Sequence, residues 1–249
     1  GMEFARTASQ RGHCVDLFEK SDCLGGVLNM AAAPDFKADI KNYLEWSIRS
    51  VNMCDNVTVH LNTEAKPEDL SGYEVVVVAI GSEPIIPQFV KDNPNVVWVG
   101  DLEKGNATVG DDVVIVGAGL TGCECALSLS KQGKNVTLVD MIDEQSFGSG
   151  GAKFNQVALM GLLNDNHVKC IGNVKLVSNN NQLGFEHNGQ SMDLAYDHVV
   201  LSLGVRPNPE VLSTFEDCAN EVIYIGDCNT RIGTLYNAVH TAHEAASVL

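Results

Sequence analysis

The chain has 249 residues, of which 45% are hydrophobic, with a mean hydropathy of +0.01 and a formal net charge of −16. This length and composition predict a globular protein of about two domains with a substantial core. The negative charge argues against nucleic acid or an anionic membrane as a partner, because either would favour a basic surface. With no signal peptide, no apolar run of about 18 residues and no CxxC motif, we expect a cytoplasmic protein whose eight cysteines are free thiols.

The first predicted elements are a helix over residues 2–11 and a strand over residues 14–18 that ends at Glu19. A carboxylate at the end of such a strand is the expected partner of an adenosine ribose. Gly25 and Gly26 follow shortly afterwards. A glycine pair is often only a loop, but after an acid-terminated strand it predicts backbone that approaches a second phosphate-bearing segment.

A second helix is predicted over residues 35–50, where apolar residues recur every four positions. Strands are predicted over residues 57–61 and 75–80. The second of these strands runs into Gly81 and two spaced prolines. A buried strand that leaves through glycine and proline is typical of a stiff crossover between domains.

Residues 112–140 carry the strongest motif of the chain, a strand, a glycine turn, a helix and a second strand that ends at an acid. Gly117 permits the sharp exit from the first strand, Gly119 lets backbone N–H groups approach a pyrophosphate, and Gly122 lets the helix pack closely on the sheet. The N-terminus of the helix then points at the phosphate. Together these features predict a dinucleotide-binding unit.

Asp140 lies 18 residues after Gly122 (140 − 122), where its carboxylate can accept both ribose hydroxyls. No Arg or Lys occurs in residues 141–143 to receive a 2′-phosphate. We therefore expect NAD(H) rather than NADP(H).

Cys123 and Cys125 form a CxC pair at the start of the predicted helix. Such a pair is either a set of small packing residues or a low-pKa thiol pair, and we favour packing. Residues 146–151 are predicted to be a flexible loop, and residues 152–165 a helix. Residues 168–203 read as a small β-meander with a turn at 179–181, typical of the end of such a domain.

Gly204 and Pro207 repeat the spacing of Gly81 and Pro84, three residues in each case (207 − 204 and 84 − 81). Two segments with the same glycine–proline spacing, each directly after a predicted strand, imply that one domain is inserted into another. We therefore predict an α/β fold with two Rossmann-like, three-layer dinucleotide-binding domains, the first over residues 1–104 and 205–249 and the inserted domain over residues 105–204.

The last predicted strand delivers Gly226 and Asp227 to a helix over residues 235–249. This arrangement can offer a carboxylate to a polyol and N–H groups to a phosphate or flavin oxygen. His240 and His243 lie three residues apart on the helix, but no third ligand type is nearby. We expect surface histidines, no metal site and no catalytic side chain.

An internal repeat links the two ends of the chain. Residues 1–19 align with residues 122–140 at an offset of 121, with seven of the 19 positions identical. Gly1 falls on the third glycine of the motif, whether it is native or left by tag removal. The first strand of the first unit is thus missing, and we expect unpaired strand edges at residues 15–18 and 222–225.

The motifs GAGLTG, LFEK with LGG, VAIGSEPIIP, LSLGVRPN and VIYIGDC together resemble the two-dinucleotide-binding-domain flavoproteins over essentially the whole chain. The sequence motifs LFEKSDCLGG and IGDC are most similar to those in the C-terminal half of NADH:flavin oxidoreductases of the 2,4-dienoyl-CoA reductase and 2-enoate reductase type. In that family an N-terminal old-yellow-enzyme barrel carries FMN and an iron–sulfur cluster.

The resemblance implies that the split first domain binds FAD and the inserted domain NADH. Electrons would pass from NADH to flavin, and from there to the FMN and iron–sulfur barrel, which is absent from this chain; a homo-oligomer is compatible with the sequence. Two alternatives remain, a non-catalytic fragment that binds NAD or no cofactor, and a stand-alone disulfide reductase, which the lack of a CxxC motif disfavours. The implied cofactor-binding residues are Gly1, Glu19, Lys20, Gly25, Gly26, Gly81, Gly226, Asp227, Gly117, Gly119, Leu120, Thr121, Gly122, Asp140 and Gly204.

Overall fold

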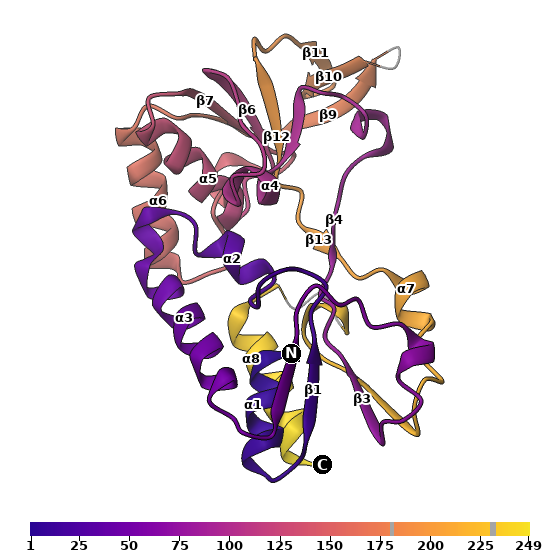
Figure 1. Ribbon diagram of the computed structural model, residues 1–249. Coiled ribbons are helices and arrows are strands. Elements are labelled where there is room, and N and C mark those ends of the chain that lie inside the picture. Colours follow the sequence, from indigo (N-terminus) through magenta and orange to yellow (C-terminus); the bar gives the residue numbers. More distant parts are fainter. Residues whose placement is uncertain (180–181, 230–232) are drawn as a thin grey trace. The chain divides into compact units, whose positions relative to one another are not determined.

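A computed structural model describes residues 1–179, 182–229 and 233–249 of the chain (Figure 1). These residues form two compact units. Unit 1 comprises Gly1–Ala32, Lys37–Glu83 and Val205–Leu249, and unit 2 comprises Ala33–Phe36 and Pro84–Gly204. The chain therefore passes into the main part of unit 2 after Glu83, whereas the sequence places this boundary after residue 104.

Unit 2 is built on one five-stranded parallel sheet. Its order is β5-β12-β6-β7-β8, so β6 lies in the middle and pairs with both neighbours. The β-branched residues of β6 are buried on both faces of the sheet, as expected for a central parallel strand. The strands are β5 (Val96–Trp98), β12 (His198–Leu201), β6 (Asp112–Val116), β7 (Asn135–Val139) and β8 (Lys169–Ile171).

Different layers cover the two faces of this sheet. One face packs Ile115 and Leu138 against Leu127 and Leu163 of the helices. The other face packs Val116 and its neighbours against a three-stranded antiparallel sheet. The helices are α4 (Val99–Glu103), α5 (Leu120–Lys131) and α6 (Lys153–Asp165), and the antiparallel strands are β9 (Val174–Asn179), β10 (Gln182–His187) and β11 (Gln190–Met192). The three layers and the β-meander agree with the sequence prediction, although residues 180–181 of the expected turn lie outside the described residues.

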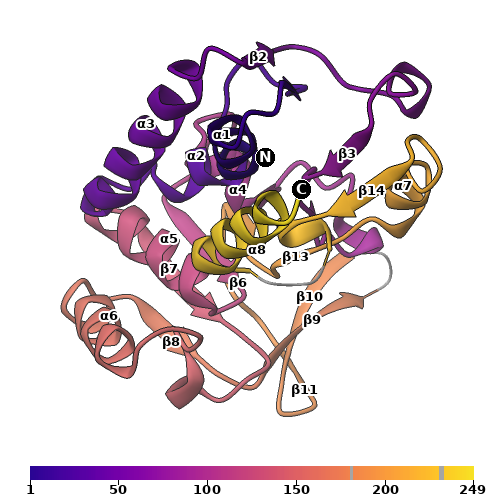
Figure 2. The same ribbon diagram turned by 90° about the horizontal axis from the view of Figure 1, so that it is seen from below.

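Unit 1 contains two separate pairs of parallel strands, β1 with β2 and β3 with β14. Figure 2 shows β3 beside β14. Among the described residues, no strand joins the two pairs into one sheet. The strands are β1 (Val15–Phe18), β2 (Val57–His60), β3 (Val75–Val78) and β14 (Glu221–Tyr224). The helices are α1 (Met2–Gln10), α2 (Val27–Ala31), α3 (Ala38–Asn52), α7 (Pro209–Ser213) and α8 (Leu235–Ser247).

The strand that faces β1 is β3. Tyr73, two residues before β3, lies edge-on to Phe18 of β1, with ring centroids 6.3 Å apart. The expected open edges at residues 15–18 and 222–225 are both present, because among the described residues β1 pairs only with β2 and β14 pairs only with β3. β14 pairs with one side of β3, and the other side of β3 faces β1.

The two glycine–proline segments, residues 81–84 and 204–207, lie side by side. Gly81 and Gly204 both have positive φ, +74° and +84°. The short strands that follow them, β4 (Glu83–Pro84) and β13 (Val205–Arg206), pair with each other. No described helix of the chain is long and apolar enough to cross a membrane.

Candidate cofactor site

The turn between β6 and α5 has the geometry that its glycines predict. Gly117 has a φ of +108°, and a Cβ atom there would lie 2.3 Å from the carbonyl oxygen of Ser202. A Cβ atom on Gly122 would lie 1.9 Å from the carbonyl oxygen of Gly117. Both positions are therefore restricted to glycine, one by its backbone conformation and both by close packing.

Gly119 differs from these two glycines, because no heavy atom lies within 4 Å of the place where its Cβ would be. It is the N-cap of α5, and the next residues, Leu120 and Thr121, are exposed. The N–H groups of the first turn of a helix have no partner within the helix. The turn thus offers open space, free donors and a partial positive charge, which is the environment that a phosphate requires.

Asp140 follows β7 directly and is tied to this turn. One carboxylate oxygen accepts a hydrogen bond from the N–H of Ala118 at 2.6 Å, and the other accepts one from the N–H of Ile142 at 3.2 Å. A carboxylate has about four acceptor positions, so ribose hydroxyls can still donate to it. The structure therefore brings Asp140 and the glycine turn together.

The loop after β7 is anchored, and the expectation of a flexible loop over residues 146–151 is wrong in its first half. Phe147 is fully buried, and the N–H of Gly148 donates to the carbonyl of Ala118 at 2.8 Å. Gln156 of α6 donates to the carbonyl oxygen of Phe147 at 2.7 Å. The sequence carries no local signal for these contacts, because their partners belong to other elements.

Cys123 and Cys125 are buried packing residues of α5, as predicted. Burial raises the pKa of Cys123 to about 12 and raises the pKa of Cys125 well above its ordinary value. A buried thiol of this kind is a poor nucleophile at neutral pH. None of the eight cysteines, all of which lie within the described residues, forms a disulfide bond.

In unit 1, several predicted site residues gather at the carboxyl ends of the strands. Glu19 follows β1, Gly81 lies three residues beyond β3, and Gly226 and Asp227 lie two and three residues beyond β14. The hydroxyl of Ser82 donates to the carbonyl of Asp227 at 2.6 Å and so joins the two loops. Ser82 was not singled out from the sequence, although it directly follows Gly81.

The carboxylate of Glu19 is already engaged. Its Oε1 accepts from the N–H of Ser21 at 2.9 Å and from the hydroxyl of Ser21 at 2.7 Å. Asp227 similarly accepts from the N–H of Gly233 at 3.2 Å. Lys20, next to Glu19, is exposed to solvent.

The two glycines after β1 have different roles. Gly25 has a φ of +119°, and a Cβ atom there would lie 2.7 Å from Leu44 of α3. Gly26, the N-cap of α2, has open space around it. Gly25 is therefore required for packing, whereas Gly26 is free to let a ligand approach the backbone.

Gly1 caps α1 at the same end of unit 1. A Cβ atom on Gly1 would lie 3.2 Å from Leu17 of β1 and 3.8 Å from Ala79, which follows β3. The N-terminus of α1 thus lies between the two pairs of strands, where the repeat predicts the third glycine of a phosphate-binding turn.

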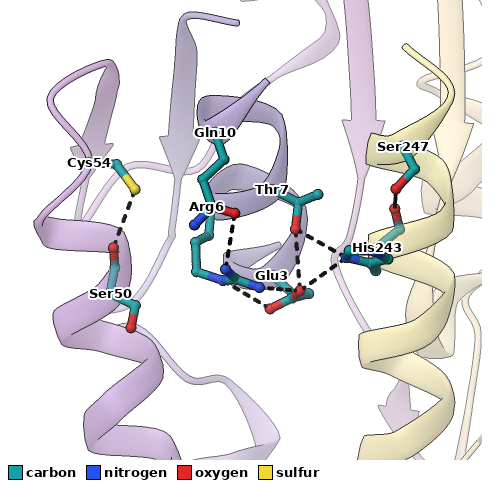
Figure 3. Close-up of polar contacts among 8 residues, drawn as sticks. All are labelled: Glu3, Arg6, Thr7, Gln10, Ser50, Cys54, His243 and Ser247. Atoms are coloured by element: carbon teal, nitrogen blue, oxygen red, sulfur yellow. Dashed lines mark hydrogen bonds and ion pairs between the residues drawn. The ribbon is translucent and has the colours of Figure 1, made fainter. Parts of the chain in front are cut away.

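Both histidines of α8, His240 and His243, contact neighbouring side chains. The ring of His240 lies tilted against that of Tyr236, with ring centroids 4.0 Å apart. His243 lies 3.5 Å from Glu3 and 3.4 Å from the hydroxyl of Thr7 (Figure 3). Glu3 also pairs with Arg6, so a polar network joins α1 to α8. Within the described ranges, no group of three or more His, Cys, Asp or Glu side chains could hold a metal ion.

Comparisons with known proteins agree with this geometry. The chain is 31% identical to a bilirubin reductase of Mediterraneibacter gnavus, over all of this chain and 39% of the relative. It is also 31% identical to a cinnamate reductase of Clostridium sporogenes, over 99% of this chain and 37% of that protein. The chain therefore spans about two fifths of the length of the curated relatives it matches.

The fold also matches a solved structure. The structure of a 2-naphthoyl-CoA reductase in complex with 2-naphthoyl-CoA superposes on all of this chain with a TM-score of 0.90, at 26% identity and over 38% of the larger chain. The family model described as pyridine nucleotide-disulphide oxidoreductase matches residues 1–242. The glycine turn, its acid and the repeated unit thus have one explanation, and the chain belongs to the pyridine nucleotide-disulphide oxidoreductase family.

Proposed function

We propose that the chain is the NADH- and FAD-binding part of a larger reductase, in which unit 2 binds NADH and unit 1 binds FAD. The observation that carries the proposal is the turn between β6 and α5. Gly119 is open there, and Asp140 is hydrogen-bonded to the same turn. An open helix N-terminus with an acid beside it suits a pyrophosphate and a ribose.

The preference for NADH over NADPH rests on the residues that follow Asp140. Met141 and Ile142 are exposed, and the carboxylate of Asp143 accepts a hydrogen bond from the N–H of Gln145. No cation in residues 141–143 can pair with a 2′-phosphate, and Asp143 would repel one.

In unit 1, glycines and an acid likewise lie at the carboxyl ends of the strands, and we assign FAD to this position. Glu19 would accept from the adenosine ribose, Gly26 would let backbone approach a phosphate, and the loops at Gly81 and Gly226 would border the cofactor. FAD, when bound, supplies hydride acceptance and onward electron transfer. The side chains of the protein need only bind, orient and shield it, so we assign no catalytic acid or base.

The rest of the electron path is proposed by analogy with the relatives. The chain would take electrons from NADH and pass them to an FMN and iron–sulfur barrel that reduces an enoyl-type substrate. The relatives are named as reductases of bilirubin, cinnamate and 2-naphthoyl-CoA, which supports the proposal of a reductase. Cysteines without disulfide bonds fit a reducing, cytoplasmic compartment.

A second candidate is a nucleotide-binding protein without flavin. It is favoured by one observation in unit 1. In unit 2, the central strand β6 and a glycine turn lead into α5, whereas no described strand lies between β1 and β3 of unit 1. The two candidates differ in whether the chain binds FAD.

Titration of the 249-residue chain with NADH, NADPH and FAD tests both candidates. We expect NADH to bind more tightly than NADPH. Gly119→Ala should weaken NADH binding about tenfold, or ~1.4 kcal/mol, without loss of folding, because the added Cβ points into open space. Asp140→Asn should also weaken NADH binding.

Glu19→Gln is the matched control, because Glu19 occupies the position of Asp140 in the other half of the repeat (140 − 121). It should leave NADH affinity unchanged and reduce FAD retention. Released FAD near one per chain supports the first candidate, and NADH binding with no FAD at saturation supports the second. If NADH does not bind, or if Glu19→Gln and Asp140→Asn weaken it equally, the assignment of unit 2 is wrong.

A further inference from the structure

We propose that Gln156 of α6 is a positioning residue for the nucleotide of unit 2, and that it acts on the glycine turn between β6 and α5 through two peptide groups in series. This role rests on the proposed function, in which NADH binds at that turn. We define the amide relay as the side-chain amide of Gln156, the peptide group that joins Phe147 to Gly148, and the peptide group that joins Ala118 to Gly119.

The side chain of Gln156 is buried, and its hydrogen bonds fix its orientation. Its Nε2 donates to the carbonyl oxygen of Phe147 at 2.7 Å and to that of Gln145 at 3.2 Å. Its Oε1 accepts from Nζ of Lys153 at 2.8 Å. Because a carbonyl oxygen only accepts and an ammonium group only donates, a flipped amide could not make these contacts. The amide therefore directs both of its donors at the loop that precedes α6.

The first peptide group of the relay carries this orientation to the turn. The carbonyl that Gln156 binds belongs to Phe147, and the N–H of the same peptide group belongs to Gly148. That N–H donates to the carbonyl oxygen of Ala118 at 2.8 Å. The C=O and N–H of a trans peptide group lie in one plane and point in opposite directions. By holding the carbonyl, Gln156 therefore holds the N–H of Gly148 on Ala118.

The second peptide group ends at the open N-terminus of α5. The carbonyl of Ala118 shares its peptide group with the N–H of Gly119, which consequently points away from Gly148. Gly119 is the N-cap of α5, and the space around its Cβ position is open. A phosphate oxygen at this helix N-terminus would accept from that N–H. The relay thus sets the direction of a donor to the pyrophosphate.

Further contacts hold the middle of the relay in place. A Cβ atom on Gly148 would lie 3.7 Å from Cγ of Gln156 and 3.8 Å from Sγ of Cys123. The thiol of Cys123 also donates to the carbonyl of Ala118, at 3.4 Å, and the N–H of Ala118 donates to Asp140 at 2.6 Å. Both backbone polar groups of Ala118 are thus engaged within the protein. A turn that is oriented before the nucleotide arrives loses less entropy on binding.

The relay begins at a positive charge. The ammonium of Lys153 donates to Gln156, and each later amide group accepts at its oxygen and donates at its N–H, in one direction as far as Gly119. The positive ends of the three amide dipoles therefore point toward the nucleotide. Hydrogen bonds in such a chain polarise one another. We expect the N–H of Gly119 to be a stronger donor to an anionic phosphate than it would be without the relay.

The 249-residue chain carrying Gln156→Met tests the relay, because methionine has a similar length and no strong donor. We expect this variant to bind NADH about fivefold more weakly than the unaltered chain, which corresponds to the loss of one net hydrogen bond. Leu163→Val is the matched control, since Leu163 is fully buried in the same helix. It should lower the unfolding temperature but leave NADH affinity within about twofold. Equal weakening by both variants would mean that Gln156 only supports the fold, and would overturn the proposal.

Selective nitrogen-15 labelling of the glycines observes both peptide groups directly. In Gln156→Met, we expect the amide of Gly148 to exchange with solvent at least about tenfold faster. The amide proton of Gly119 in the NADH complex should resonate upfield of its position in the unaltered chain, because its hydrogen bond to phosphate is weaker. The amide of Gly133, which donates to Ser130 at the other end of α5, should not change. Unchanged signals of Gly148 and Gly119 would overturn the proposal.

Lys153→Met gives a test at an exposed position, where the substitution does not disturb the core. We expect about twofold weaker NADH binding at low ionic strength and no difference at about 0.5 M salt, which screens the charge. The amide proton of Gly119 should move upfield by less than in Gln156→Met. Equal affinities at low ionic strength would overturn the part assigned to Lys153.

The unaltered chain separates this proposal from the proposed function. If it binds no NADH, the proposed function and the relay are both wrong. If it binds NADH and Gln156→Met binds NADH equally well, only the role of Gln156 is wrong.

Discussion

The two halves of the internal repeat have the same local structure but different surroundings. α1 and β1 in unit 1 reproduce the turn hydrogen bonds of α5 and β7 in unit 2. Leu138 and Val139 of β7 are fully buried, whereas the equivalent Leu17 and Phe18 of β1 are half-buried. The difference is the neighbouring strand, because β7 pairs on both sides and β1 on one.

This comparison separates what a segment forms by itself from what its neighbours add. α1 and β1 keep their conformation although β1 has a strand on one side only. Full burial of the strand requires a neighbour on both sides. Since burial of apolar surface is the dominant favourable term in folding, we expect unit 1 to be the less stable half.

The chain provides a reporter for each unit. Trp46 lies in α3 of unit 1, and Trp98 lies in β5 of unit 2. In a Trp98→Phe background, fluorescence reports on unit 1, and in a Trp46→Phe background it reports on unit 2. Urea unfolding of both backgrounds gives a free energy of unfolding for each unit.

The largest contrast is expected at the equivalent glycines. Gly122→Ala places a Cβ atom against the carbonyl oxygen of Gly117, so the backbone of unit 2 must move. We expect a loss of about 3 kcal/mol or more. Gly1→Ala meets the flexible end of Leu17 at 3.2 Å and Ala79 at 3.8 Å, an ordinary contact distance, and should cost less than about 0.5 kcal/mol. Similar losses in both units would show that the two turns are not differently packed.

A smaller contrast is expected at the equivalent leucines. Leu138→Ala removes a fully buried side chain and should reduce the stability of unit 2 by about 3 kcal/mol. Leu17→Ala removes a half-buried side chain and should cost unit 1 about 1 kcal/mol. The same urea titrations measure both. A larger loss for Leu17→Ala would mean that β1 is buried in solution.

The smallest contrast depends on pH. The hydrogen bond from His60 lowers the pKa of Asp16 in unit 1, and the N–H groups of Asp112 and Asp111 lower the pKa of Asp197 in unit 2. A carboxyl whose pKa is depressed on folding stabilises the protein above its unfolded pKa, and this contribution is lost as the pH falls through the folded pKa.

Asp16→Asn should therefore destabilise unit 1 at pH 6 by about 0.5 kcal/mol, as for other exposed pairs, and should have no effect near pH 2. Asp197→Asn should likewise destabilise unit 2 at pH 6 and have no effect near pH 2. Unfolding at both pH values, followed with the tryptophan of each unit, checks the sign. A destabilisation that persists unchanged at pH 2 would show that ionisation is not its cause.

Much of the candidate site could be predicted from the sequence, because its signals are local. Gly117 requires positive φ and Gly122 requires close packing, and both demands appear within one turn of chain. The CxC pair could also be assigned to packing from its place in α5. Ser82 and Gln156 could not be found in this way. Ser82 bonds to Asp227, 145 residues away, and Gln156 anchors a loop that the local composition predicted to be flexible.

The sequence by itself determined the two dinucleotide-binding motifs, their repeat and the helices and strands that carry them. These features depend on backbone conformation and hydrophobic periodicity within a few residues. Only the tertiary structure decided that β3 rather than β14 faces β1, and that the described strands of unit 1 form two pairs. The order of strands depends on the packing of segments far apart in the chain, and the energy of that packing is not contained in any one of them.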